Sequence, residues 1–303
     1  MAVSNRHILE QGPVIAGLAM TAVTAVAQKV SGKKPAPLAT PTPAITEVAP
    51  PRSHDLVRDF VRGCGGDPAW YRGNVPAHFF PQWAFPVAGK TLAGIPYPIE
   101  AVMNGGCRLE INGPIPEGKK LKTQAQLVEI DDNGRRAVLK QRIVTGTEED
   151  PAALCIYLFP IIPLRGGSKG GDKAEKKEPL FVPSNAKELC RWDIGRDAGL
   201  DFAKLTGDFN PIHWVPPYAK AFGFGGVILH GFATMARAIE GMNRHLFKGD
   251  PTKLRVFDCQ FTKPLRIPAN VGLYVTEDNK VFVADRAVEG GSVYLRGSFE
   301  VTD

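Results

Sequence analysis

The sequence predicts an α+β fold in two similar halves, each a long helix wrapped by a curved antiparallel sheet. Three observations lead to this prediction. The C-terminal part of the chain has one helical stripe followed by four strand-like runs, and the preceding part repeats that order less clearly. At 303 residues, with 44% apolar and 22% charged residues, the chain also has the length and composition for two ordinary globular cores.

The helix of the C-terminal half is predicted by apolar residues that recur at helical spacing. They are Phe232, Met235, Ala236, Ile239, Met242 and Leu246. After Gly249 the pattern changes to runs rich in Val, Phe and Tyr, which favour strands. We expect these strands at Leu254–Lys263, Val271–Glu277, Lys280–Val288 and Ser292–Val301.

The N-terminal half is predicted to follow the same order with a less regular helix. That helix would cover residues 77–92, where Pro81 and Pro86 leave it irregular or broken, because proline removes a helical hydrogen bond. We expect the strands that follow at Leu121–Ile130, Arg136–Thr145 and Leu154–Pro160.

The two halves read as degenerate copies of one sequence. The segment Phe60–Trp70 echoes Phe202–His213 with one residue missing, and Arg108–Pro114 echoes Asp258–Pro264. The offsets between the copies, 142 to 150 residues, are compatible with each other. A duplicated architecture is therefore expected.

The alignment of the copies places different chemistry at corresponding positions. Trp70 falls opposite His213, and Gly66 or Asp67 falls opposite Asp208. The N-terminal copy has thus lost its imidazole, so it cannot perform the same proton transfers as the C-terminal copy.

The most specific motif is the run from Phe202 to His213, Phe-Ala-Lys-Leu-Thr-Gly-Asp-Phe-Asn-Pro-Ile-His. Pro211 fixes its own φ and pushes Asn210 out of the helical region, so the helix expected before it must end. Asp208 and His213 then project from a loop. Two titratable groups of different reference pKa on one short loop suit paired proton removal and delivery.

This motif resembles the hydratase-2 signature of the MaoC-like dehydratases, a hot-dog-fold family. The signature is an aromatic residue, a spacer, Gly-Asp-x-Asn-Pro, an aliphatic residue, His, and Ala or Ser six positions later. Its slots are filled by Phe202, Gly207, Asp208, Asn210, Pro211, Ile212, His213 and Ala219. The downstream run Ile228–Gly231 matches the family's continuation into the central helix. The whole layout resembles the single-chain (3R)-hydroxyacyl-thioester dehydratases, which implies a double hot-dog.

The resemblance implies reversible addition of water to a trans-2-enoyl thioester, giving the (3R)-3-hydroxyacyl thioester of fatty-acid metabolism. It implies that Asp208 and His213 share the acid and base tasks through one water, and that Asn210 orients that water or the loop. The backbone N–H of Gly231, at a helix start, would stabilise charge on the thioester oxygen. His230 is expected to be structural. Asp208 or His213 alone could have a purely structural role. Their occurrence together at this spacing favours a catalytic role.

The implied substrate is an acyl-CoA or acyl-carrier-protein thioester, with no further cofactor and no metal. The net charge of +6 (37 − 31) is spread without an arginine-rich block, which argues against a nucleic-acid partner. This charge would either help attract anionic carriers or serve only as ordinary solubility charge. A double hot-dog satisfies the fold's pairing need within one chain, so a monomer and a homodimer are both compatible.

The cysteines and the N-terminus indicate the compartment. The five cysteines are scattered, odd in number and without a Cys-x-x-Cys pair, which favours a reducing compartment, the cytoplasm. The apolar run Pro13–Ala27 is too short to span a bilayer, and Glu10 weakens it as a signal peptide. We expect a helix that packs on the protein, in preference to contact of residues 10–28 with a membrane surface.

The predicted organisation has four parts. An N-terminal helix and a Pro-rich tether take residues 1–52, and a degenerate hot-dog takes 53–165. A solvated linker of low hydrophobicity takes 166–184, and the catalytic MaoC-like hot-dog takes 185–303. We infer that the inactive half gives the acyl chain room, an inference that a first-half pocket closed by side chains would contradict.

Two other functions compete with this one. A hot-dog thioesterase typically carries a carboxylate on the helix and lacks the Asp-x-Asn-Pro-x-His loop. A catalytically silent acyl-thioester binding or scaffolding protein could keep the loop behind a blocked entrance. An open tunnel that reaches Asp208 and His213, with the Gly231 N–H facing it, would favour catalysis.

Overall fold

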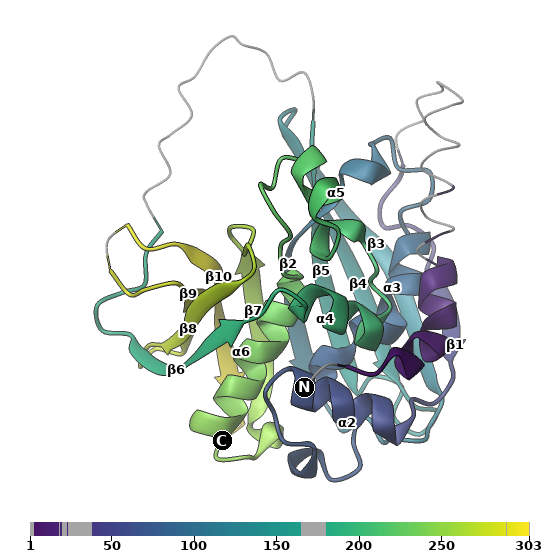
Figure 1. Ribbon diagram of the computed structural model, residues 1–303. Helices are drawn as coiled ribbons and strands as arrows, with labels where there is room; N and C mark the ends of the chain where they lie inside the picture. The colour runs from purple at the N-terminus through teal and green to yellow at the C-terminus, as the bar shows by residue number, and fades with distance from the viewer. Residues whose placement is uncertain are drawn as a thin grey trace.

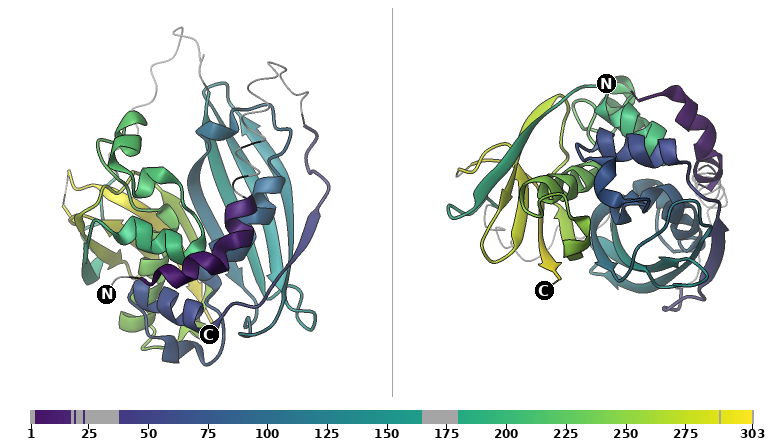
Figure 2. Two further views of the ribbon diagram at one scale, coloured as in Figure 1. Left: turned by 45° about the vertical axis from the view of Figure 1, so that its right-hand side comes forward. Right: turned by 90° about the horizontal axis from the view of Figure 1, so that it is seen from below.

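One antiparallel sheet runs through both halves of the protein. The structure is a computed structural model that describes residues 3–17, 19, 23, 38–164, 180–288 and 290–302. Ten strands of these residues pair in the order β1-β3-β4-β5-β2-β7-β10-β9-β8-β6 (Figure 1). The halves join where β2 (Met103–Ile111) pairs with β7 (Leu254–Phe261). Each half-sheet curves around a helix, as the predicted double hot-dog requires (Figure 2).

The N-terminal half-sheet curves around α3 (Pro81–Lys90). Its other strands are β1 (Ile45–Ala49), β3 (Leu121–Asp132), β4 (Arg136–Gly146) and β5 (Leu154–Pro163). The helix expected over residues 77–92 is broken as predicted, because the 3₁₀ turn η3 (Ala77–Phe79) precedes the α-helix. Pro81 takes the first helical position, where a missing N–H costs nothing.

The C-terminal half-sheet curves around α6 (Gly231–His245). Its other strands are β6 (Lys187–Ile194), β8 (Ala269–Val275), β9 (Lys280–Ala284) and β10 (Val293–Val301). The predicted apolar stripe is buried in the core up to Met242, whereas Leu246 lies beyond the last turn and is exposed. The strand predicted over Lys280–Val288 ends at Ala284.

Several shorter elements connect these layers. They are α2 (His54–Gly63), η2 (Pro68–Tyr71), η4 (Ile99–Ala101), α4 (Ala198–Thr206), η5 (Pro211–His213), α5 (Pro216–Ala221) and η6 (Pro251–Lys253). Helices α2 and α4 pack on each other, with the rings of Phe60 and Phe202 6.2 Å apart. One hydrophobic core therefore runs through both halves.

Two segments predicted as tether and linker contribute to the fold. Residues Ile45–Ala49 lie inside the predicted tether but form β1, which pairs with β3 in register Ile45↔Ala125. Val182 lies inside the predicted linker but is buried beside Tyr274 and Phe282. Short apolar contacts override the polar composition around them. Residues 29–37 of the predicted tether and 166–179 of the predicted linker lie outside the described residues.

Matching hydrogen bonds confirm the internal duplication. The N–H of Val75 donates to the carbonyl of Ile115 at 2.7 Å, and that of Leu229 donates to the carbonyl of Leu265 at 2.8 Å. In both halves these bonds precede the start of the central helix. The turns η2 and η5 correspond as well, so Trp70 occupies the place of His213 in the first half.

The N-terminal segment packs on α4, just before the loop predicted to be catalytic. The turn η1 (Asn5–Gln11) continues into helical residues 12–17. Buried Gln11 donates through Nε2 to the carbonyl oxygens of Lys204 at 3.2 Å and Leu205 at 3.0 Å. The predicted packing helix is confirmed up to residue 17, and most of 18–27 lies outside the described residues. No helix within the described ranges is long and apolar enough to cross a bilayer.

We predict that Gln11→Ala destabilises the protein by about 1–3 kcal/mol, because two buried carbonyls of α4 lose their donor. Urea unfolding measures this change. The control is Gln124→Ala on the exposed face of β3, whose amide makes only a 3.4 Å bond to Thr46; it should change stability by less than about 0.5 kcal/mol. Equal effects of the two substitutions would contradict the capping role.

Candidate active site

The predicted catalytic loop begins at a glycine that no other residue could replace without strain. Helix α4 ends at Thr206, and Gly207 follows with φ +82°, donating its N–H to Ala203. A Cβ at Gly207 would lie 2.6 Å from that of Val14, in the N-terminal segment. Both the left-handed backbone and the packing therefore require glycine. This turn directs the chain away from α4 and into Asp208.

The next turn is capped by Asn210. Its Oδ1 accepts the N–H of Ile212 at 3.3 Å, while Pro211 starts η5 with φ already set for the turn. The Asp208 carboxylate accepts the N–H of Asn210 at 3.4 Å. Asn210 itself is exposed. Of the two roles expected for Asn210, the described contacts support orientation of the loop; contact with a bound water remains a prediction.

His213 is buried with one ring nitrogen already occupied. Its Nδ1 lies 2.8 Å from the carbonyl of Ile228, so Nδ1 carries the proton and donates to that oxygen. The Nε2 atom of the neutral ring then holds the lone pair. Burial lowers the pKa of His213 below its usual value, against the opposing effect of the Asp208 charge. The ring is therefore neutral at pH 7 and can accept a proton.

A second imidazole lies against the first. The rings of His213 and His230 stack with centroids 3.5 Å apart and planes 24° apart. His230 Nε2 lies 2.9 Å from the backbone carbonyl of Asp208 and donates to it. Burial and the neighbouring His213 lower the pKa of His230 to about 3, so it stays neutral. His230 thus holds the backbone of Asp208 in place, which agrees with the structural role expected for it.

The fold brings Asp208, His213 and His230 together. One ligand-type atom from each lies within 4.8 Å of the others. A metal ion could in principle sit among such atoms. The Nε2 of His230, which lies 3.8 Å from the Asp208 carboxylate, donates to a carbonyl and has no lone pair to offer, whereas its buried Nδ1 has no hydrogen-bond partner among the described residues. The Nε2 of His213 and the Asp208 carboxylate are thus the two groups placed for proton transfer.

Gly231 starts α6 beside this cluster, as predicted. Its N–H belongs to the first turn, where backbone N–H groups have no helical acceptor. A Cβ at Gly231 would lie 2.8 Å from the ring of Phe261 on β7. The glycine is therefore required for close packing of the helix on the sheet, in addition to the ligand approach expected from sequence.

The sequence did not reveal how His230 and the N-terminal segment support the loop. His230 was visible in the run Leu229–Gly231, yet its bond to Asp208 spans 22 residues of chain. The contact between Val14 and Gly207 spans nearly 200 residues. Neither contact could be predicted, because no local sequence pattern indicates which distant residue is the partner.

The carboxylate that a thioesterase would need is present on α6 but is enclosed. Glu240 is 0% exposed, and its Oε1 accepts the hydroxyl of Tyr71 at 2.8 Å. A cavity of about 440 Å³ lies near this end of α6 and is lined by Trp70, but by neither Asp208 nor His213. The tunnel expected at Asp208 and His213 remains a prediction.

Comparisons with known proteins agree both with the observed fold and with the family that the loop motif resembles. Residues 182–293 match the family described as MaoC like domain, and this range contains the entire Asp208–Gly231 arrangement. The chain therefore contains a MaoC-like domain in its C-terminal half. Among solved structures, the chain is similar to HtdX of Mycobacterium tuberculosis, with a TM-score of 0.67 and 19% identity over 86% of this chain and 100% of that chain.

Further similarities support the double hot-dog. Another Mycobacterium tuberculosis protein, described as having a double hotdog fold, aligns with a TM-score of 0.58 at 15% identity, covering 88% of this chain and 97% of that one. In sequence, the chain is 27% identical over 185 residues to a probable enoyl-CoA hydratase 2 of Dictyostelium discoideum. That match covers 60% of this chain and 63% of its relative.

A higher identity is confined to a shorter stretch. The 3-hydroxyacyl-thioester dehydratase X of Mycobacterium tuberculosis is 41% identical over 103 residues, covering 34% of this chain and 33% of the relative. The chain therefore spans less than two thirds of the length of both of these relatives.

We predict that Gly231→Ala lowers stability by about 1–3 kcal/mol, because the new methyl group overpacks against the Phe261 ring. Adding Phe261→Leu should restore most of the lost stability, which thermal or urea unfolding measures. The control is Gly195→Ala, where a Cβ meets nothing within 4 Å. If the double variant is no more stable than Gly231→Ala alone, the contact is not the cause.

Proposed function

We propose that this protein is a (3R)-specific enoyl-thioester hydratase and 3-hydroxyacyl-thioester dehydratase, a hydro-lyase of fatty-acid metabolism. One observation carries the proposal. A carboxylate, Asp208, and a neutral imidazole with a free Nε2, His213, lie on one loop against the start of α6. Residues 185–303 would form the catalytic half, and residues 53–165 its non-catalytic companion.

The reaction needs two coordinated proton transfers. Hydration adds a water oxygen to C3 of the trans-2-enoyl thioester and a proton to C2; dehydration reverses both steps. The lone pair of His213 Nε2 and the Asp208 carboxylate can both accept hydrogen bonds from one water. As the oxygen attacks C3, the pair takes a proton from the water and returns a proton to C2. The two residues act as a unit in this scheme.

Charge that develops on the thioester oxygen needs a donor. The backbone N–H of Gly231 lies in the first turn of α6, a 15-residue helix, where the helix dipole also favours negative charge. His230 precedes Gly231 and holds the Asp208 carbonyl, so it couples the position of the donor to that of the carboxylate. This contact fixes the acid-base pair relative to the oxyanion site.

The substrate class is an acyl thioester carried by coenzyme A or an acyl-carrier protein. The enoyl-CoA hydratase 2 and hydroxyacyl-thioester dehydratase names of the relatives support this class. The positive net charge favours either anionic carrier. The five free cysteines, four of them buried, support a reducing compartment such as the cytoplasm. Because one chain already forms the continuous sheet, a monomer and a homodimer are both compatible with the fold.

We predict that Asp208→Asn and His213→Ala each lower kcat/KM for crotonyl-CoA and longer enoyl-CoA esters by about 10²–10⁴-fold, because each removes a proton-transfer partner. The loss of enoyl absorbance measures the rate of hydration. The control is Asp67→Asn, a carboxylate in the degenerate loop of the first half, which should leave kcat/KM unchanged.

Near wild-type activity of either variant would contradict the roles assigned to these residues. A wild-type protein inactive on every chain length, as both coenzyme A and carrier-protein thioesters, would favour a silent acyl-thioester binding protein instead. Hydrolysis of the thioester without hydration would favour the thioesterase.

The pH dependence follows from the lowered pKa of His213. The reaction needs the neutral ring, so acid removes activity by protonating Nε2. Because burial moves this pKa below the usual 6.5, we expect kcat/KM to be level at pH 7 and to fall only below pH 6.5. A pH profile of kcat/KM measures the midpoint; a midpoint above 6.5 would contradict the neutral, buried imidazole.

A further inference from the structure

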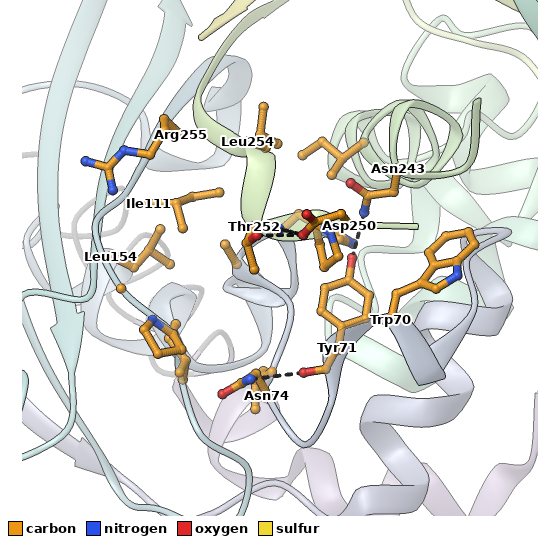
Figure 3. Close-up of a pocket in the computed structure, with 18 of the residues that line it drawn as sticks. Trp70, Tyr71, Asn74, Ile111, Leu154, Asn243, Asp250, Thr252, Leu254 and Arg255 are labelled. Atoms are coloured by element: carbon orange, nitrogen blue, oxygen red, sulfur yellow. Dashed lines mark hydrogen bonds between the residues drawn. The ribbon is translucent and has the colours of Figure 1, made fainter. Parts of the chain in front are cut away.

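The cavity beside the degenerate loop lies where the duplication places a second active site. Its volume is about 440 Å³, and its lining includes Trp70 and Ile111 (Figure 3). Ala77 also lines it. Trp70 stands in the place of His213. Ala77 follows Val75 as Gly231 follows Leu229 in the matched hydrogen bonds. The cavity is thus the first-half counterpart of the catalytic site.

The proton-transfer groups of the catalytic site are gone from this counterpart. The Trp70 indole packs against Gly249, and the guanidinium of Arg244 lies 5.0 Å above its ring. Ile111 replaces the Phe261 ring that fills the space beside Gly231. A shorter side chain at this position leaves space that the aromatic ring occupies in the other half.

The walls of the cavity are mainly apolar. They include Ile111, Leu154 and Leu254 (Figure 3). Val75, Leu109 and Ile239 line the cavity as well. The volume falls within the range of about 300–1,000 Å³ that is typical of small-molecule sites. Apolar walls of this extent suit an aliphatic chain.

A fixed polar group closes one side of the cavity. The hydroxyl of Tyr71 donates to Glu240. It also accepts a hydrogen bond from Asn243 Nδ2 at 3.0 Å (Figure 3). Burial and the Glu240 charge raise the pKa of Tyr71, so its hydroxyl keeps its proton. The Oδ1 of Asn243, which is 1% exposed, has no hydrogen-bond partner among the described residues. A buried acceptor left open is costly, which points to a ligand or water in this wall.

The lining also contains two exposed cations. These are Arg72 and Arg255. The carboxylate in the lining, Asp250, is held by the N–H of Thr252 at 3.1 Å and its hydroxyl at 2.6 Å. Hydrogen bonds from Thr252 and the charges of Lys253 and Arg72 lower the pKa of Asp250, so Arg72 already faces an anion in the lining. Arg255 therefore carries the attraction for an anionic group at the edge of the cavity.

We propose that this cavity is a second, non-catalytic site that binds an aliphatic acyl chain with an anionic head, such as a fatty acid or an acyl thioester. Ile239, which lines it, follows Gly231 by eight residues, or about 12 Å along α6. The site is thus separate from the catalytic end of the helix. Its occupancy does not depend on the hydratase activity.

Binding of decanoate and of saturated decanoyl-CoA tests the proposal and distinguishes the two sources of the chain. By calorimetry on the full chain, decanoate should bind once per chain. Ile111→Trp, which fills the cavity, should abolish this binding, and Arg255→Ser should weaken it about two- to fivefold. The control Arg286→Ser, an exposed arginine outside the cavity lining, should leave binding unchanged.

Two further measurements keep the test independent of folding and of catalysis. Ala77→Phe fills the cavity from another wall, and circular dichroism checks that both filled variants fold. Saturating decanoate should leave the KM for crotonyl-CoA unchanged. The proposal would be overturned if decanoate competed with crotonyl-CoA, or if decanoate still bound to both filled variants in their folded state. It would also be overturned if the wild type bound neither decanoate nor decanoyl-CoA. Loss of hydratase activity alone would not affect it.

Discussion

The pairing of β2 with β7 is the interaction on which the rest of the structure depends. In this antiparallel register Cys107 faces Cys259 and Arg108 faces Asp258, which are also joined by an ion pair. The pairing relates the two halves by an approximate two-fold rotation. It brings α2 against α4, and it places one loop near the start of α6 and the degenerate loop near its end. Both the proposed catalytic cluster and the cavity of the first half follow from this one junction.

The duplicated arrangement lets one half specialise. In the C-terminal half the loop keeps Asp208 and His213, and the close contact of Gly231 with Phe261 fixes the helix start. In the N-terminal half, Trp70 and Ile111 take the corresponding places, and a cavity remains instead of a catalytic cluster. Burial of two stacked, neutral imidazoles is costly, and it is tolerated because each ring donates to a backbone carbonyl.

The sequence predicted what depends on local chemistry. The break after α4, the start of α6 at Gly231 and the irregular first-half helix follow from glycine and proline rules. The sequence did not predict β1 or the burial of Val182, because these short apolar stretches lie within segments rich in proline and lysine. It also could not show that His230 binds the Asp208 carbonyl or that Gln11 caps α4, because these contacts join residues far apart in the chain.

The protonation state of the two stacked imidazoles decides whether His213 can act as a base. Nitrogen-15 NMR of histidine-labelled protein reports the charge and the tautomer of each ring as pH changes. At pH 7 we expect both rings to be neutral, with His213 protonated on Nδ1 and His230 on Nε2, and we expect His213 to titrate below pH 6.5. A charged ring at pH 7, or a His213 proton on Nε2, would contradict a neutral base at this site.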